Sequence, residues 1–179
     1  MAEATDIQKQ RAIEAAQGYL MLDLPDAALR RLGLFTDSEE TPPAVEQLRG
    51  EAFKQKEQYE TALRHFERVP ADAEHNLELL MSMAWCFKRI GRLDKAIESM
   101  RAVYHGSPKI AVVLYNLACY YALAGEKEDA LSWLARAFRM DISLRKLVPR
   151  ETDFDAIRND QEFIYLMQLS EPKKSSKPS

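Results

Sequence analysis

A period of 34 residues runs through most of the chain and limits the folds that it can adopt. When the sequence is aligned to itself with this shift, one column contains only alanine, at Ala28, Ala62, Ala96 and Ala130. An aromatic residue precedes each alanine by nine positions, at Tyr19, Phe53, Phe87 and Tyr121. A small residue precedes it by twelve positions, at Ala16, Gly50, Ala84 and Ala118. Such a period indicates a repeat architecture in which each repeat is one supersecondary unit.

The spacing inside one repeat predicts two helices joined by a turn. Ala84 and Phe87 are three residues apart and therefore share one face of a first helix. The column alanine and the large apolar residue four positions after it share one face of a second helix. Gly91 and Gly125 lie between the two helices, where glycine accepts the left-handed backbone of a helix C-terminus. Leucine and alanine are abundant and β-branched residues are few, which also favours helices.

These helix-turn-helix units resemble the tetratricopeptide repeat (TPR). The last repeat carries the family's pattern most fully, at Leu114, Leu117, Ala118, Tyr121, Gly125, Ala130, Leu134, Ala137 and Asp141. The resemblance implies an all-α fold, a right-handed α-solenoid of about four hairpins that forms a single domain over residues 1–170. The repeats are predicted at residues 9–42, 43–76, 77–110 and 111–144. The second repeat departs from the pattern at Glu46 and Arg49, where apolar residues are usual.

A C-terminal cap is predicted over residues 145–170, followed by a polar, disordered tail at residues 171–179. The pattern Asp-Phe-Asp-x-Ile-Arg-x-Asp-x-x-Phe at residues 153–163 resembles the closing segment of many bacterial TPR arrays. Asn159 and Glu162 have the spacing of a capping box that opens a capping helix. Three apolar residues are expected to cover the last hairpin, namely Leu144, Leu147 and Val148.

Charge and composition argue against several functional classes. The net charge of −3 lacks the basic excess of a nucleic-acid-binding protein. The three histidines are scattered, His65 and His105 are expected to face solvent, and neither a metal nor a cofactor is expected. No Ser-His-Asp set is evident, so we predict that the chain is not an enzyme. Two cysteines, no signal-peptide pattern and no membrane-length apolar run predict a cytoplasmic protein without membrane insertion.

The first helices of stacked hairpins line a concave groove, which is the expected binding surface. The residues predicted to line it are Met81, Trp85, Tyr115, Asn116 and Cys119, with Lys54, Lys88 and Arg89 forming a positive edge. Exposed aromatic side chains of this kind are typical of binding hot spots. We expect the groove to bind a peptide segment of another protein, apolar with flanking acidic residues. The alternative is that Trp85 and Tyr115 are covered by the chain's own C-terminal helix or by a second subunit.

The predicted function is therefore a non-catalytic protein-interaction module or adaptor. A first alternative is a dedicated export chaperone, because the class II chaperones of type III secretion are similar in size, acidity and repeat type. A client protein that is soluble only when co-expressed would favour it. A second alternative is a self-assembling structural scaffold, a homo-oligomer in which the aromatic cluster is the interface. A monomer in light scattering at high concentration would contradict this second alternative.

The groove hypothesis predicts the outcome of one double substitution. Replacing Trp85 and Tyr115 together by alanine removes the aromatic contacts and should abolish partner pull-down. The helical circular dichroism spectrum should stay unchanged, and retained binding would contradict the hypothesis.

Overall fold

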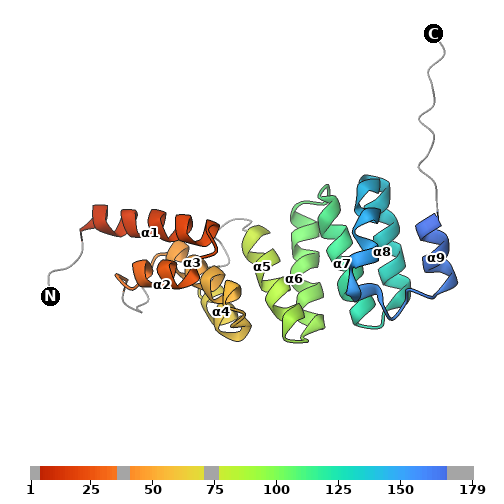
Figure 1. Cartoon of the computed structure of the whole chain (residues 1–179), viewed down its shortest axis with the longest axis horizontal. Helices are drawn as coiled ribbons and strands as arrows, with labels where there is room; N and C mark the ends of the chain where they lie inside the picture. The colour runs from red at the N-terminus through yellow and green to blue at the C-terminus, as the bar shows by residue number, and fades with distance from the viewer. Residues whose placement is uncertain (1–4, 36–40, 71–76, 169–179) are drawn as a thin grey trace, which may run out of the picture. The chain divides into compact units, whose positions relative to one another are not determined.

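The computed structural model describes residues 5–35, 41–70 and 77–168, so the predicted tail lies outside the described residues. Every regular element in these ranges is a helix (Figure 1), which confirms the all-α fold class. The contacts divide the chain into two compact units, Met1–Ser99 and Met100–Ser179, and the boundary lies inside α6. The assignment of residues 1–170 to one domain, and the exact repeat boundaries, stay predictions.

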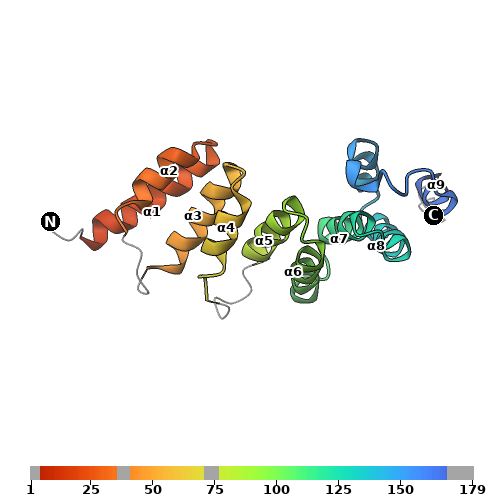
Figure 2. The same cartoon turned by 90° about the horizontal axis from the view of Figure 1, so that it is seen from below.

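The first unit consists of consecutive helical hairpins. Figures 1 and 2 show α1 beside α2 and α3 beside α4, and α2 also packs against α3. α4 and α3 both contact α5. The bounds are α1 Asp6–Met21, α2 Pro25–Leu32, α3 Pro43–Gln55, α4 Tyr59–Phe66, α5 Leu77–Arg89 and α6 Leu93–Gly106.

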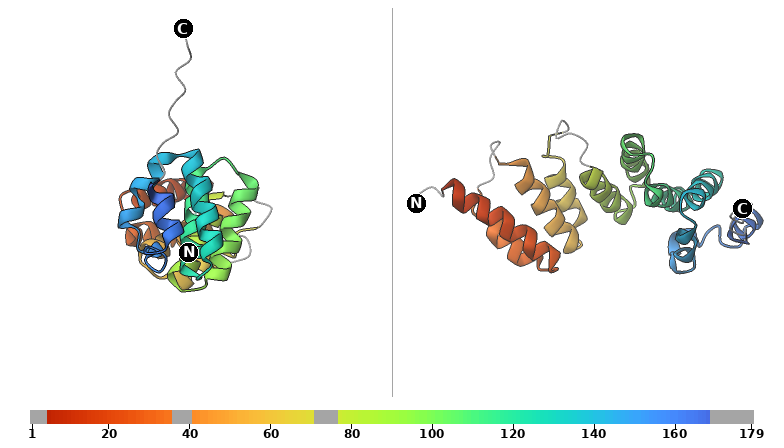
Figure 3. Two further views of the ribbon diagram at one scale, coloured as in Figure 1. Left: turned by 90° about the vertical axis from the view of Figure 1, so that its right-hand side faces the viewer. Right: turned by 90° about the horizontal axis from the view of Figure 1, so that it is seen from above.

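The second unit contains one complete hairpin and a cap. Helices α7 (Ala111–Leu123) and α8 (Lys127–Met140) form the hairpin. The cap comprises three short 3₁₀ turns and one helix: η1 Ile142–Lys146, η2 Val148–Arg150, η3 Thr152–Phe154 and α9 Gln161–Gln168. η3 packs against α7, whereas η1 and α9 pack against α8, as can be followed in the blue segments of Figure 3.

Each hairpin turns through the same backbone motif, which repeats with the 34-residue period. The carbonyl of every column aromatic accepts a 2.9 Å hydrogen bond from the N–H five residues later, in the pairs Leu24–Tyr19, Gln58–Phe53, Arg92–Phe87 and Glu126–Tyr121. The residue before each donor has a positive φ, at Asp23 (56°), Glu57 (57°), Gly91 (76°) and Gly125 (80°). This is the Schellman ending of a helix. The left-handed backbone predicted at Gly91 and Gly125 is confirmed, and two non-glycine residues adopt it as well.

The small residues of the repeat lie where helices touch. All four column alanines are fully buried, at 0% exposure. At Gly50 in α3, an added Cβ would lie 2.3 Å from the Phe66 ring of α4, so this ring occupies the space that a side chain would need. The small columns therefore set the distance between paired helices.

Glu46 and Arg49 are buried, although they replace apolar residues of the repeat pattern. The Arg49 guanidinium donates to Glu46 Oε1 at 3.0 Å and to the backbone carbonyls of Phe35 at 2.7 Å and Leu32 at 3.3 Å. Buried charges are tolerated when they are paired and hydrogen-bonded in this way. Arg49 thus ties the end of the first hairpin to α3.

The prediction that His65 faces solvent is wrong. Its ring stacks on Phe53 with centroids 5.2 Å apart and interplanar angle 1°, and its Nδ1 lies 2.8 Å from Glu46 Oε2. The buried carboxylate of Glu46 requires nearby hydrogen-bonding partners, which explains why this histidine turns inward. His105 is exposed, as predicted.

The cap differs from its prediction in two details. Asp160, not Asn159, caps α9, because its carboxylate accepts from the N–H groups of Glu162 at 2.9 Å and Phe163 at 3.4 Å. Leu144 and Val148 are buried as predicted, but Leu147 is exposed. η1 ends at Lys146, so Leu147 lies at the junction between η1 and η2 and not on a continuing helix face with Leu144.

Glu57 occupies the left-handed position that glycine occupies at Gly91. Its side chain is exposed, so Glu57→Gly relieves backbone strain without removing packing. We expect the free energy of unfolding to rise by about 1 kcal/mol, measured by urea denaturation. The matched variant Gly91→Ala, which has open space around the new Cβ, should lower it by a similar amount. Equal effects in the same direction would contradict the strain argument.

Candidate functional site

Trp85 is the exposed aromatic side chain at the centre of the candidate site. It lies on α5 with 44% of its surface exposed. The Lys88 Nζ lies 5.4 Å from the centre of its ring, and the Arg89 Cζ lies 6.0 Å from it. Arg89 also stands over the Tyr59 ring at 5.4 Å and donates from Nε to the Tyr59 hydroxyl at 3.1 Å. We call Trp85, Lys88, Arg89 and Tyr59 the Trp85 patch.

The helical spacing of α5 explains why these side chains gather. Lys88 and Arg89 follow Trp85 by three and four residues, so all three project from one side of the helix. Tyr59 begins α4 and fixes Arg89 through its hydroxyl. The patch is therefore a largely pre-arranged surface in which two cations flank one indole ring.

Lys54 was predicted to belong to the positive edge of the groove, and the structure gives its charge another role. The Lys54 ammonium forms an ion pair with Glu51 on its own helix and donates to the Ser82 hydroxyl of α5 at 2.8 Å. Ser82 donates in turn to Glu51. These contacts hold α3 against α5, so the charge of Lys54 is compensated within the protein.

Of the remaining predicted groove residues, Met81 on α5 and Asn116 on α7 are half-buried. Tyr115 and Cys119, which we expected on an open groove, are 4% and 2% exposed and lie beneath the cap. The Tyr115 ring meets Phe154 of η3 edge-on with centroids 5.8 Å apart. The alternative of coverage by the C-terminal segment therefore describes Tyr115, whereas Trp85 is exposed.

The two cysteines are both buried, and one of them lies beside acidic residues of the cap. Cys86 is fully buried, and burial raises the pKa of its thiol to about 12. Cys119 lies beside Glu151 and Asp153 of the cap, with their ligand atoms all within 4.8 Å of one another. Cys119 and the two carboxylates are far apart in the sequence, so no local spacing signals the cluster.

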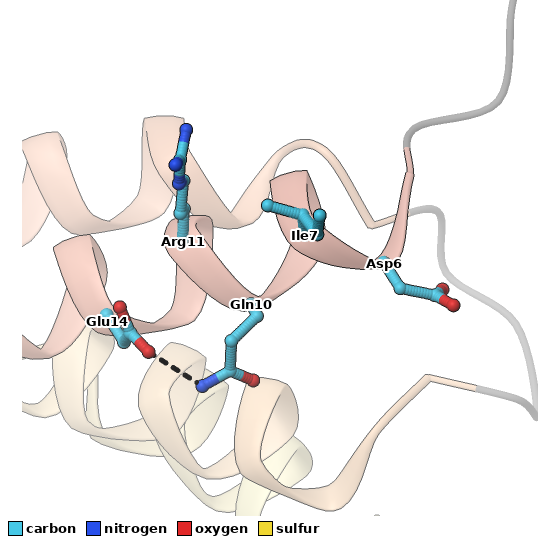
Figure 4. A pocket seen from close by; sticks show the side chains of 5 residues that line it. All are labelled: Asp6, Ile7, Gln10, Arg11 and Glu14. Atoms are coloured by element: carbon cyan, nitrogen blue, oxygen red, sulfur yellow. Dashed lines mark hydrogen bonds between the residues drawn. The ribbon is translucent and has the colours of Figure 1, made fainter.

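A shallow depression lies along α1, apart from the predicted site residues. Figure 4 shows its lining side chains, Asp6, Ile7, Gln10, Arg11 and Glu14, which all come from this one helix. Gln10 donates a hydrogen bond of 2.9 Å to Glu14. A surface formed by a single helix lacks the convergent walls of a small-molecule site.

Among the described residues, no helix has the length and apolar character to cross a membrane.

Comparison with known proteins identifies the fold and leaves the family open. No family model and no curated protein sequence matches the chain. Several solved structures of MamA are similar. MamA AMB-1 superposes with a TM-score of 0.74 at 15% identity, covering 90% of this chain and 87% of that one. MamA 41-end from Desulfovibrio magneticus RS-1 gives a TM-score of 0.70 at 20% identity, covering 94% and 97%. The chain thus shares the all-helical, TPR-type fold of MamA.

Phe154 is the apolar residue that holds η3 over Tyr115, and it is fully buried. Phe154→Ala should lower the free energy of unfolding of the second unit by about 3–5 kcal/mol, measured by urea denaturation. Tyr165→Ala on α9, where the ring is 66% exposed, should change it by less than about 0.5 kcal/mol. Similar losses in both variants would show that η3 does not depend on this contact.

Proposed function

We propose that the chain is a non-catalytic protein-interaction module that binds a peptide segment of a partner on the Trp85 patch. The observation that carries the proposal is the exposed Trp85 ring with two cationic side chains within 6.0 Å of its centre. The fold shared with MamA supports the proposal by analogy only, because one fold hosts many functions. Two buried free cysteines accord with a reducing compartment, and we place the protein in the cytoplasm.

The chemistry of the patch selects the kind of peptide. An apolar or aromatic side chain can cover the exposed indole ring and remove it from water. An acidic residue beside it can pair with Lys88 and Arg89, whose charges flank that ring. The peptide that fits has an apolar anchor next to aspartate or glutamate. Met81, half-buried on the same helix, would extend the apolar contact.

The test is a selection from a displayed library of random peptides, carried out with the wild-type chain and with Trp85→Ala. The wild type should enrich peptides that combine an apolar anchor with acidic neighbours. A synthetic peptide from that selection should bind Trp85→Ala roughly 30-fold more weakly, the cost of losing a hot-spot tryptophan. Tyr115 is left unchanged in this design, because its ring packs beneath the cap and its replacement would disturb the fold, contrary to the sequence-based expectation for the double substitution.

Tyr165→Ala is the matched control, since it removes an aromatic side chain from α9 that is 66% exposed, more than Trp85 at 44%. It should keep wild-type affinity. A Trp133→Phe background leaves Trp85 as the single tryptophan, and its fluorescence should shift to shorter wavelength when peptide binds. Enrichment of basic peptides, or equal affinity of wild type and Trp85→Ala, would contradict the proposal.

Self-assembly is a second candidate function, and it has its own observation. Met21, Leu22 and Leu24, at the turn between α1 and α2, are all exposed, and adjacent apolar side chains of this kind favour a protein contact. A concentration-dependent mass in light scattering that Met21→Glu abolishes would support it. A monomeric mass at high concentration would exclude it.

A further inference from the structure

The contact between the cap and α7 contains a compact group of metal-ligating side chains. Cys119 comes from the second half of α7, and Glu151 and Asp153 flank the start of η3. The thiol sulfur and one oxygen of each carboxylate lie within 4.8 Å of one another, and both Cys119 and Asp153 are buried. The Asp153 N–H also donates to the Glu151 carboxylate at 3.3 Å, which holds the two acidic residues together.

Tyr115 gives an independent indication that this group meets a ligand. Tyr115 is 4% exposed, and its buried hydroxyl has no hydrogen-bond partner among the residues that the structure describes. Tyr115 precedes Cys119 by one helical turn, so both project from one face of α7. The Tyr115 ring packs edge-on against Phe154, the residue that follows Asp153, so Tyr115 lies at the same contact between α7 and η3 as the cluster. A buried polar atom without a partner is costly and calls for an explanation.

The charges of the cluster match a divalent cation. A cation between a thiol sulfur and two carboxylate groups at this distance would be attracted to all three side chains at once. Arg158 is close, but its guanidinium donates to the backbone carbonyls of Glu151 at 2.7 Å and Val148 at 3.3 Å and to the Asp155 carboxylate at 2.8 Å. Arg158 therefore holds in place the loop that carries Glu151.

The donor atoms select the class of metal. A thiolate favours zinc and similar transition ions over magnesium and calcium, which prefer ligand sets made only of oxygen. Zinc holds sulfur at about 2.3 Å and carboxylate oxygen at about 2.0–2.2 Å, which places tetrahedral ligands roughly 3.5 Å apart. Atoms within 4.8 Å of one another reach this spacing by shifts on the order of 1 Å.

We propose that Cys119, Glu151 and Asp153 form a binding site for a zinc-class divalent cation, with the Tyr115 hydroxyl facing the remaining coordination position. The ion joins α7 to a segment that lies far along the chain. It acts as a structural clamp that fastens the cap to the last hairpin. This site lies wholly in the second unit and is independent of peptide binding at the Trp85 patch.

The test uses the full chain, stripped with chelator and kept reduced, and cobalt(II) as a coloured substitute for zinc. Wild type should bind one equivalent of cobalt and show the thiolate-to-cobalt charge-transfer absorption. Cys119→Ser should lose this absorption, whereas Cys86→Ser, which alters the other buried thiol, should retain it. Asp153→Asn should weaken zinc affinity at least tenfold, because even outer-shell changes cost roughly 10–100-fold.

Tyr115→Phe separates a metal role from a packing role. It keeps the ring against Phe154 and removes only the unpartnered hydroxyl. The metal-free variant should therefore melt at a higher temperature than metal-free wild type, while its gain in Tm on adding zinc should be smaller. This variant also keeps the proposal testable if Cys119→Ser fails to fold.

Two results would overturn the assignment. One is the absence of saturable cobalt binding and of the charge-transfer absorption in folded wild type. The other is one-to-one binding that persists in both Cys119→Ser and Asp153→Asn, which would place the ion elsewhere.

Discussion

The close approach of helices at each alanine of the 34-residue period is the constraint on which the rest of the structure depends. Ala28, Ala62, Ala96 and Ala130 have no exposed surface, and a larger side chain at any of them would separate paired helices. The Schellman turns follow the same period. The carbonyl of each column aromatic accepts a 2.9 Å hydrogen bond from the backbone N–H five residues later, just before the next helix begins. Helix spacing and turn geometry together determine which residues of each helix face solvent.

Much of the fold could be predicted, because the residues that recur with the 34-residue period are those that each helix buries. The hairpins, the fully buried alanines and the left-handed Gly91 and Gly125 all follow from the repeat. Exceptions to the pattern were less predictable. Glu57 adopts a glycine-like conformation because the turn dictates φ whatever residue is present. Glu46 and Arg49 replace apolar residues with an ion pair, and this pair in turn draws His65 inward.

The candidate site was predictable only in part. The position of a residue within the repeat predicts which side of its helix it lies on, but it does not predict which other segment covers that side. Trp85 and Tyr115 occupy related positions on first helices, yet Trp85 is 44% exposed and Tyr115 is 4% exposed. The difference arises from η3, whose Phe154 meets Tyr115 across a long sequence separation. The same contact brings Cys119 close to Glu151 and Asp153, and no local sequence motif predicts this group. The chain thus exposes Trp85 and buries Tyr115.

We propose that a peptide binds on the exposed side of α5, whereas the equivalent side of α7 is covered by the chain's own cap. Hydrogen–deuterium exchange of the full chain, with and without a bound peptide, distinguishes the two helices. We expect added protection in α5, Leu77–Arg89, and at the start of α4 beside Tyr59, with exchange in α7, Ala111–Leu123, unchanged. Protection that appears in α7 and is absent from α5 would contradict the account.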